Sequence, residues 1–486
     1  MNKSKNIDCD IIIFGTKGDL AQRKLFPAIY KLEKYCKLHT NTRIIGVGRA
    51  TWNINEYLNI IKTSLEKFSK EKINNTVWIK LRKRINFCNL DVNYIEHFVY
   101  LKKMLTSKNK LLINYLAMPP NTFSIICKGL ASIQLNLKNS RIILEKPIGS
   151  SLKTSLDINK QVSKYFLESQ IFRIDHYLGK ESILNLLSFR FANPIFMNIW
   201  NNQFIDHIQI TVSEKIGIEG RWNYFNNSGQ IRDMIQNHLL QILTLISMKK
   251  PINLKSESIR CEKVKILQSL RMITNKDVMD NVVLGQYSSG IIDGIKVPSY
   301  LTEGNDKNSL TETYAAIKVH IDNKNWKGVP FYLRTGKRLH KKFSEIVIFF
   351  KPIKKNIFTR YDNFKKNNKI IIRLEPNEGI KIDFLNKNPG LETEYILKNT
   401  NMNFYYKKSF KNFNLIEAYE RLILESIRGE QTLFVHKNEV EASWKWIDVL
   451  IKSCKSEYNI PKIYKSGTYG PIESIQLINK DNREWY

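Results

Sequence analysis

The order of apolar and amphipathic segments in the first third of the chain is its strongest constraint. Between Asp10 and Ile174, short apolar runs such as DIIIFG, RIIGVG and SRIILEKP alternate with segments of helical periodicity. This alternation is typical of βαβ units, whose parallel strands are apolar throughout because helices cover both faces of the sheet. The sequence therefore predicts an α/β, Rossmann-type doubly wound parallel sheet domain over residues 1–178.

The remainder of the chain has a different pattern. Longer strand-like segments, among them DHIQITVSE, TYAAIKVHI, VPFYLRTG and KIIIRLEP, follow one another with helical segments on either side. Such a succession predicts an α+β domain with a large, mostly antiparallel sheet over residues 179–486. Two domains also fit the length, because 486 residues exceed the size at which a single hydrophobic core stops growing.

The first predicted strand runs into the turn GTKGDLA, which opens a helix. Glycines at this place permit a tight turn and a close approach of backbone N–H groups to a pyrophosphate, and the helix N-terminus adds a positive dipole. An ordinary strand-to-helix loop is the alternative, but the surrounding βα units favour dinucleotide binding. The candidate cofactor residues in this turn are Gly15, Thr16, Lys17, Gly18, Asp19, Leu20 and Ala21.

The residue after the second strand bears on which dinucleotide binds. An Asp or Glu at that place would bond the ribose hydroxyls and reject a 2′-phosphate, whereas this chain has Arg49. A guanidinium suits bidentate recognition of phosphate, so the sequence favours NADP over NAD. The alternative is an exposed arginine that binds no ligand.

Two later strands also end in candidate residues. Tyr115 lies at the end of one strand, and Glu145-Lys146-Pro147 ends the next. Open α/β sheets bind ligands at the carboxyl ends of their strands, so we expect Tyr115 near the cofactor and Lys146 near cofactor or substrate. Pro147 is expected to hold a special, cis turn. Taken alone, EKP is a common surface tripeptide.

Four polar side chains crowd the end of the last parallel strand in RIDHYLGKE, namely Asp175, His176, Tyr177 and Lys180. Cationic and hydrogen-bonding groups that converge on one point suit a dianionic ligand, and a sugar phosphate is a ligand of this kind. The alternative for this segment is an exposed linker between domains.

A histidine lies in the apolar helical segment RDMIQNHLL. If the dinucleotide oxidises the sugar at its hemiacetal carbon C1, the proton of the C1 hydroxyl must be removed. The unperturbed pKa of histidine suits this task near neutral pH. His238 is therefore the candidate general base, with Asp175 as the carboxylate that orients it. A single histidine in such a helix is more often a satisfied core residue.

The segment from Arg334 to Lys342 follows a strand and contains a glycine turn and five basic side chains. It is either a charged hairpin loop or a further source of cations for the phosphate. The two preceding segments favour the second interpretation.

The net charge of +32 raises the question of a nucleic-acid partner. The lysines are spread along the whole chain without a basic arm, which favours a solvated surface and no nucleic acid. The six cysteines form no CxxC pair, so we expect neither a metal site nor a disulfide framework. Because no signal peptide and no bilayer-spanning apolar run is evident, we expect a cytoplasmic protein without a membrane partner.

Together these segments closely resemble the glucose-6-phosphate dehydrogenase family, its bacterial members most of all. The resemblance covers nearly the whole chain and rests on the motifs GTKGDLAQRKLFP, GVGRA, NYLAMPP, EKPIG, RIDHYLGKE, EGRWNYF, RDMIQNHLLQ, VPFYLRTGK, EPNEG and RGEQTLF. It implies NADP-dependent oxidation of glucose 6-phosphate at C1 to 6-phosphogluconolactone, the first step of the oxidative pentose phosphate pathway. It also implies a homodimer or homotetramer formed through the sheet of the second domain.

The resemblance further implies roles for single residues. His238 would be the general base, paired with Asp175, and Lys146 would lie between sugar and nicotinamide. The residues implied to hold the phosphate are His176, Tyr177, Lys180 and Lys342. Those implied to contact the sugar are Glu214, Asp233, Lys337 and Lys24. One departure is Glu375, where many relatives have Gln, and this added carboxylate is expected to affect substrate affinity more than activity.

Two other functions stay open on these grounds. Another Rossmann-type sugar oxidoreductase would also carry an EKP turn and an added antiparallel sheet, and it would reduce NADP with free aldoses or inositols but not with glucose 6-phosphate. A nucleic-acid-binding protein with an inactive dehydrogenase fold would show steeply salt-dependent binding without NADP reduction. The pairing of RIDHYLGKE with RDMIQNHLL argues against the first, and the complete set of acid, base and cation positions argues against the second.

Overall fold

The computed structural model describes residues 6–69, 71–105, 110–353, 357–358, 367–391, 396–410, 416–457 and 460–486. These residues form two compact units. The first unit lies within Met1–Glu181, Ile252–Arg260 and Ile416–Glu441, and the second lies within Ser182–Pro251, Cys261–Leu415 and Ala442–Tyr486.

The first unit is built on a seven-stranded sheet. In spatial order its strands are β17 (Phe434–Val435), β6 (Ile171–Ile174), β5 (Ser140–Leu144), β4 (Leu111–Leu116), β1 (Cys9–Phe14), β2 (Arg43–Gly48) and β3 (Ile85–Asn89). Neighbouring strands are parallel, except that β17 pairs antiparallel with β6. The expected doubly wound parallel sheet is confirmed.

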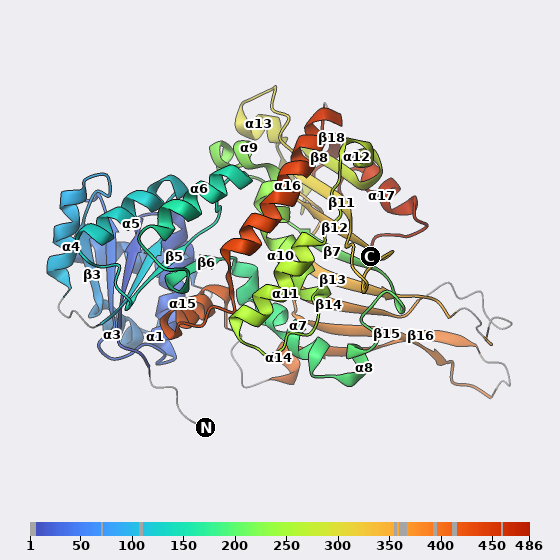
Figure 1. Ribbon diagram of the computed structural model, residues 1–486, viewed down its shortest axis with the longest axis horizontal. Helices are drawn as coiled ribbons and strands as arrows, with labels where there is room; N and C mark the ends of the chain where they lie inside the picture. The colour runs from blue at the N-terminus through green and yellow to red at the C-terminus, as the bar shows by residue number, and fades with distance from the viewer. Residues whose placement is uncertain are drawn as a thin grey trace. The chain divides into compact units, whose positions relative to one another are not determined.

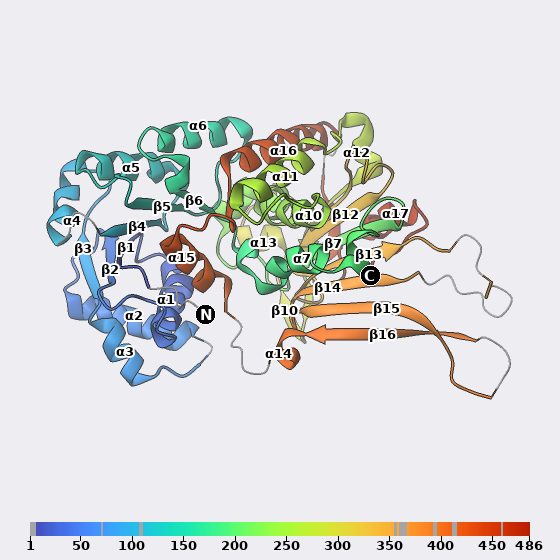
Figure 2. The ribbon, with the colours of Figure 1, turned by 60° about the horizontal axis from the view of Figure 1, so that its bottom comes forward.

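Helices cover both faces of this sheet. Figure 2 shows α5 and α6 on one side of the strands and α1 and α2 on the other. The bounds of the helices are α1 (Phe26–Lys34), α2 (Ile54–Phe68), α3 (Asn75–Arg82), α4 (Phe98–Met104), α5 (Phe123–Ser132), α6 (Leu152–Ser163) and α15 (Ala418–Arg428). Local sequence sets some of the helix ends. Asn53 and Glu56 form a capping box at the start of α2 and satisfy N–H groups that have no carbonyl partner within the helix.

A segment from late in the chain completes the first unit. β17 adds an edge strand beside β6, and α15 packs close to β5. Arg141 of β5 donates to the carbonyls of Ser426 and Ile427 at 2.6 and 2.7 Å, which satisfies the last turn of α15. Sequence periodicity places one boundary near residue 178 and does not indicate this late segment. A two-residue strand that pairs at long range leaves no periodic pattern.

The second unit holds a nine-stranded sheet. In spatial order its strands are β16 (Leu397–Tyr405), β15 (Gly379–Lys387), β14 (Lys369–Glu375), β13 (Phe343–Phe350), β7 (Ile205–Ser213), β12 (Pro330–Gly336), β11 (Tyr314–His320), β8 (Val282–Ser288) and β18 (Lys462–Lys465). Two pairs are parallel, β7 with β12 and β8 with β18, and the others are antiparallel. The expected large, mostly antiparallel sheet is confirmed.

The parallel pair in the middle of this sheet positions a group of polar residues. Ser213, the last residue of β7, lies opposite Gly336, the last residue of β12. Because the two strands run in the same direction and end at the same level, the residues that follow them leave the sheet side by side. A succession of antiparallel hairpins would have placed these two ends at opposite edges.

Helices accompany the second sheet. Figure 1 shows α7 (Glu181–Phe191) and α10 (Leu240–Ser247) beside its strands. α9 (Trp222–Gln230), η6 (Ile231–Leu239) and α10 follow one another directly, and η6 has the wider turns of a π-helix. The other elements are α8 (Pro194–Met197), α11 (Ser256–Gln268), α12 (Asn275–Asn281), β9 (Gly290–Ile292), β10 (Ile295–Val297), α13 (Tyr300–Gly304), α14 (Tyr406–Ser409), α16 (Lys437–Glu457) and α17 (Ile472–Asn479). Within the described ranges, no helix combines the length and the apolar character needed to span a membrane.

Candidate active site

The turn after β1 lies against two neighbouring strands of the first unit. The backbone N–H groups of Gly15 and Thr16 donate to the Val47 carbonyl of β2, at 3.1 and 3.3 Å. Gly15 has a φ of +79°, and a Cβ there would collide with the carbonyl oxygen of Ala117. Only glycine suits both the left-handed backbone and this close approach. Because a helix begins at Ala21, the turn has the strand-to-helix context of a dinucleotide site.

Two cations lie at this corner of the first unit. Lys17 is exposed, and its ammonium is 5.8 Å from the centre of the Trp52 ring. Arg49 directly follows β2 and is also exposed. The Gly15 turn hydrogen-bonds to the end of β2, so both side chains flank the same turn. Both can therefore reach a phosphate that binds there.

The other candidates of the turn have different surroundings. Thr16 is buried and hydrogen-bonds with the Tyr57 hydroxyl. Asp19 is exposed and forms an ion pair with Arg23. The remaining candidates differ in exposure, with Gly18 and Lys24 exposed, Leu20 half-buried and Ala21 buried.

β4 and β5 end side by side and carry the next group. Tyr115 of β4 is 1% exposed, and its hydroxyl donates to Oε1 of Glu145 at 2.5 Å. Burial raises the pKa of the Glu145 carboxyl to about 7, although the Tyr115 hydrogen bond and the Lys146 charge act in the opposite direction. Lys146 is half-buried, and the Lys146–Pro147 peptide bond is cis, as the sequence predicts.

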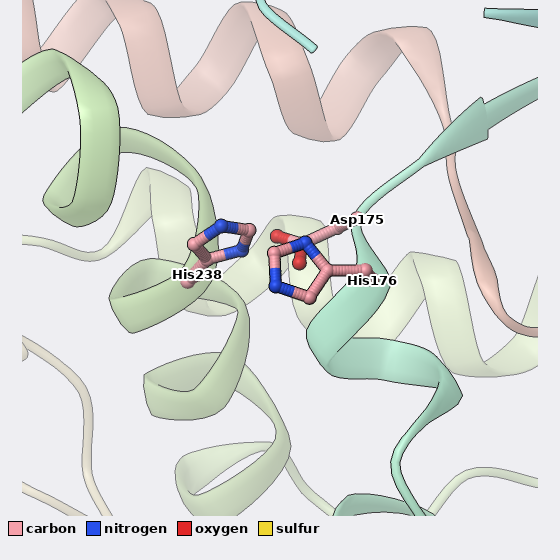
Figure 3. Close-up of side chains that lie close together, drawn as sticks. All are labelled: Asp175, His176 and His238. Atoms are coloured by element: carbon pink, nitrogen blue, oxygen red, sulfur yellow. The ribbon is translucent and has the colours of Figure 1, made fainter. Parts of the chain in front are cut away.

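After β6 the chain enters the short helix η5 (His176–Gly179), where Figure 3 shows the side chains of Asp175 and His176. Asp175 is 2% exposed, and its Oδ1 accepts the backbone N–H of Tyr177 at 3.0 Å. The His176 ring stacks on the Tyr419 ring, with centroids 6.2 Å apart and an interplanar angle of 13°. The Lys180 ammonium lies 4.2 Å from the centre of the Tyr177 ring. The polar residues of RIDHYLGKE therefore share one corner of the first unit.

In the second unit, three of the predicted sugar-contact residues form one cluster. Glu214 follows β7 and Lys337 follows β12, and the Lys337 ammonium is 2.7 Å from Oε2 of Glu214. Oδ2 of Asp233, on η6, lies 3.8 Å from the same nitrogen. The Lys337 side chain is 1% exposed, so a buried cation lies between two carboxylates. Such pairing offsets a desolvation penalty on the order of several kcal/mol per ion.

His238 lies on η6, the helix that also carries Asp233, and it is buried. Figure 3 shows its imidazole on this helix. The start of η6 is held by Glu312, whose Oε1 accepts the backbone N–H of Ile231 at 3.1 Å. Gly229 has a φ of +67°, and a Cβ there would collide with the Glu312 carboxylate. A glycine and a capping carboxylate thus determine where the helix of His238 begins.

Lys342 is exposed, and its ammonium lies 2.5 Å from Oε1 of Glu375. Lys342 precedes β13 and Glu375 ends β14, which pairs with β13. The Glu375 carboxylate therefore pairs with one of the predicted phosphate ligands.

The sequence by itself assigns no function to Glu145 or to Tyr419, although both lie beside predicted site residues. Glu145 has a local signal, since it is an acidic residue directly after an apolar strand, but a surface carboxylate would give the same signal. Tyr419 has none, because it lies on α15 and reaches His176 through the fold alone.

Comparisons with known proteins identify the family. The model of the glucose-6-phosphate dehydrogenase NAD binding domain matches residues 12–185, and that of the C-terminal domain matches residues 187–486. Glucose-6-phosphate 1-dehydrogenase of Buchnera aphidicola subsp. Schizaphis graminum is 57% identical over 483 residues, which are 99% of this chain and 98% of that protein. The enzyme of Dickeya dadantii is 51% identical over 480 residues, which are 98% of this chain and 97% of that protein.

A solved structure described as glucose-6-phosphate dehydrogenase in complex with its substrate glucose-6-phosphate is similar with a TM-score of 0.91. The two chains are 33% identical, and the similarity covers 100% of each. The family models, the bacterial relatives and this structure agree with the motifs from which the resemblance was inferred. The chain belongs to the glucose-6-phosphate dehydrogenase family and has glucose-6-phosphate 1-dehydrogenase activity.

Proposed function

We propose that His238 is the general base of this reaction and that Asp175 orients it. His238 is a buried imidazole on a helix whose start is held by Glu312. Asp175 is a buried carboxylate whose Oδ1 is held by the Tyr177 N–H. A carboxylate partner selects the imidazole tautomer that can accept the substrate proton, and it stabilises the imidazolium that forms.

One observation carries this assignment, the cluster in which the buried Lys337 ammonium lies between Glu214 and Asp233. The three residues are far apart in sequence, yet both carboxylates lie within 3.8 Å of one ammonium. A set of carboxylate acceptors and an ammonium donor suits the hydroxyls of a sugar. Because Asp233 and His238 lie on the same helix, the cluster brings sugar contacts to the element that carries the base.

The chemistry follows from these roles. His238 takes the proton of the C1 hydroxyl, the C1–H bond breaks with its electron pair, and the C1–O bond becomes the lactone carbonyl. When bound, the nicotinamide supplies the hydride acceptor. We assign the phosphate to His176, Tyr177, Lys180 and Lys342. We assign the sugar hydroxyls to Glu214, Asp233, Lys337 and Lys24, with Lys146 between sugar and nicotinamide.

We assign NADP to the dinucleotide site. The backbone at Gly15 leaves space that a Cβ would fill, which fits the close approach of a pyrophosphate. Lys17 and Arg49 are exposed cations at the same turn, and an arginine stands where a carboxylate would reject a 2′-phosphate. Tyr115 is assigned to the same site because it lies near the end of the neighbouring strand β4.

We also propose a homodimer or homotetramer formed through the second sheet. β16 is an edge strand, its Met402 is 64% exposed, and Met402, Phe189 and Phe196 are among the residues that line a groove of about 490 Å³. An exposed edge strand with apolar side chains favours pairing with a second copy. Light scattering of the purified protein measures this directly, and a monomer mass would contradict it.

A cytoplasmic location and the lack of a nucleic-acid partner belong to the same proposal. All six cysteines are free thiols, as is usual in a reducing compartment. The basic residues are spread along the chain without a basic arm.

The test is an assay of NADP and NAD reduction with glucose 6-phosphate, run on the wild-type chain and on His238→Asn. We expect His238→Asn to lower kcat by about 10²- to 10⁴-fold with little change in KM, because the base is lost and the substrate contacts remain. Full turnover by His238→Asn would contradict the assignment of the base. Equal efficiency with NAD would contradict the assignment of NADP.

A further inference from the structure

The backbone of Lys337 is held on both sides by residues from other strands of the second sheet. Its N–H donates to the Thr313 carbonyl at 3.0 Å, and its carbonyl accepts the Tyr464 hydroxyl at 2.7 Å. Thr313 directly precedes β11, and Tyr464 lies on the edge strand β18, 127 residues after Lys337. The residue that carries the buried ammonium is therefore tied to a segment far away in the sequence.

The Tyr464 hydroxyl is itself part of a chain of hydrogen bonds. Tyr464 is 3% exposed, and its hydroxyl oxygen lies 3.0 Å from Oγ1 of Thr313, which accepts the backbone N–H of Tyr287 at 3.1 Å. The Thr313 carbonyl lies farther from the Tyr464 hydroxyl, at 3.4 Å, than the Lys337 carbonyl does. Because a hydroxyl has one proton, Tyr464 donates to Lys337 and accepts from the Thr313 hydroxyl. Each bond of such a chain polarises the next and strengthens it.

Two features keep the Tyr464 hydroxyl in this place as a donor. A Cβ at Gly285 of β8 would lie 3.1 Å from Cδ1 of Tyr464, so the ring packs closely against the backbone of β8 at a glycine. Burial raises the pKa of the Tyr464 hydroxyl well above its ordinary value. The hydroxyl therefore keeps the proton that it donates to Lys337.

The chain after β18 continues along the chain after β12. The Gly467 N–H donates to the Arg338 carbonyl at 2.8 Å, and the His340 N–H donates to the Thr468 carbonyl at 2.9 Å. With the bond from Tyr464, the segment after β12 is held at three points. The first of these points is the residue whose side chain lies in the candidate sugar site.

The position of the Lys337 backbone matters because of what its side chain contacts. The ammonium is 2.7 Å from Oε2 of Glu214 and 3.8 Å from Oδ2 of Asp233. It lies at the end of a flexible four-carbon stem, so a small rotation of the backbone moves it away from both carboxylates. A backbone that is fixed at its N–H and at its carbonyl limits this movement.

We propose that Tyr464 is a positioning residue, whose hydroxyl fixes the Lys337 backbone so that the Lys337 ammonium meets the substrate sugar in one place. This inference rests on the proposed function in one respect, namely that Lys337 contacts the sugar. A side chain that is already held loses less conformational entropy when the substrate binds. The contact is made to a sugar hydroxyl that does not react, so its loss weakens the ground state and the transition state alike. The effect therefore falls on KM for glucose 6-phosphate.

The experiment measures kcat and both KM values for Tyr464→Phe, which removes one oxygen and keeps the ring. We expect KM for glucose 6-phosphate to rise about fivefold, with kcat changed less than about twofold and KM for NADP unchanged. Thr313→Val keeps the carbonyl that holds Lys337 and removes the hydroxyl that donates to Tyr464. It is expected to raise the same KM about twofold. A wild-type KM for glucose 6-phosphate in Tyr464→Phe, or an equal rise in both KM values, would overturn the inference.

Tyr300→Phe is the matched control. Tyr300 is a buried tyrosine of the same core cluster as Tyr464, and its hydroxyl donates to Oδ1 of Asn226 at 3.0 Å. Asn226 keeps a second donor, the Ser309 hydroxyl. Both tyrosine variants lose one hydrogen bond from this core and are expected to lower Tm by similar amounts, but Tyr300→Phe should change neither KM. If Tyr300→Phe raises KM for glucose 6-phosphate as much as Tyr464→Phe, the role of Tyr464 is only structural.

Lys337→Gln separates a failure of this inference from a failure of the proposed function. If Lys337→Gln leaves KM for glucose 6-phosphate unchanged, the assignment of Lys337 to the sugar is wrong and the inference falls with it. If Lys337→Gln raises this KM, adding Tyr464→Phe must have no further effect, because a residue that acts through the Lys337 ammonium is silent once the ammonium is gone. Additive effects contradict the positioning role alone. Should Lys337→Gln fail to fold, the difference between the two KM values in Tyr464→Phe and in Tyr300→Phe decides.

Discussion

The two units each bury a polar cluster, and they neutralise its charge in different ways. In the second unit the Lys337 ammonium lies between the carboxylates of Glu214 and Asp233. In the first unit the Glu145 carboxyl accepts a hydrogen bond from the Tyr115 hydroxyl, and burial raises its pKa to about 7. Opposite charges offset the cost of desolvation, whereas hydroxyl donors offset it in part and leave the carboxyl to take up a proton. The first cluster is therefore the one whose charge state changes near neutral pH.

Both clusters arise where two parallel strands end at the same level. β4 and β5 bring Tyr115 and Glu145 together, and β7 and β12 bring Glu214 and Lys337 together. Parallel strands place their carboxyl ends at one edge, so side chains distant in sequence become neighbours. Parallel strand ends therefore support both an ion-paired cluster, around Lys337, and, among the described residues, a cluster without an opposite charge at hydrogen-bond distance, around Glu145.

The largest expected effect concerns Asp175, a buried carboxylate whose Oδ1 accepts the Tyr177 backbone N–H. Asp175→Asn should lower kcat by about 10³- to 10⁴-fold, because an amide neither selects the imidazole tautomer nor stabilises the imidazolium. Steady-state kinetics with glucose 6-phosphate measure this, and both KM values should stay within a few-fold of the wild type. If kcat stays near the wild-type value, Asp175 belongs to the Glu145 cluster alone and has no share in catalysis.

The second expected effect breaks the ion pairs of the second unit. Lys337→Met leaves two carboxylates without their cation and should lower the free energy of unfolding by about 3–5 kcal/mol. Denaturant unfolding measures the loss. Lys215→Met is the matched control, because it removes a partly exposed ion pair with Asp293 and should cost no more than about 1 kcal/mol. Equal losses in the two variants would show that water already compensates the charges around Lys337.

The third effect sharpens the pH difference between the clusters. The folded pKa of Glu145 lies above its unfolded value, so the folded state binds the proton more tightly and stability falls as pH rises from about 4.5 to about 7. Relative to Glu145→Gln, the wild type should lose about 3 kcal/mol of unfolding free energy across this window. Unfolding curves of both proteins at several pH values measure the difference. A difference that does not change with pH would show that Glu145 is ionised throughout.

The smallest effect concerns the Lys342–Glu375 pair at the surface of the second unit. If Lys342 holds the substrate phosphate, Glu375 competes with the substrate for the same ammonium. Glu375→Gln should therefore lower KM for glucose 6-phosphate by up to about fivefold, the range of an exposed ion pair. The gain should vanish when Lys342→Gln is added. A higher KM in Glu375→Gln would mean that the carboxylate helps substrate binding.

The turn from Gly15 to Ala21 shows what residues that are close in the sequence can predict. The run from Gly15 to Ala21 predicts the strand-to-helix turn, and the structure has the positive φ of Gly15 and the helix from Ala21. The cis bond before Pro147 is confirmed as well. These features depend on residues within a few positions of one another, which is the range over which local motifs carry information.

The contact between Tyr419 and His176 is an example that local motifs cannot predict. Nothing near Tyr419 in the sequence indicates a neighbour at His176, since the contact exists because β17 pairs with β6 and α15 packs beside η5. The Glu375 carboxylate is visible in the sequence, but its pairing with Lys342 is not. Which side chains meet depends on strand register, and a shift by one residue would turn each of them to the other face.

The sequence by itself determined the two sheet types, the family and the residue types at the strand ends, because periodicity and short motifs carry this information locally. Only the tertiary structure decided that Lys337 lies between two carboxylates, that the Tyr115 hydroxyl donates to Glu145 and that Lys342 faces Glu375. The physical reason is that burial and charge pairing are properties of the side chains that surround a group, and those come from segments brought together by long-range strand pairing.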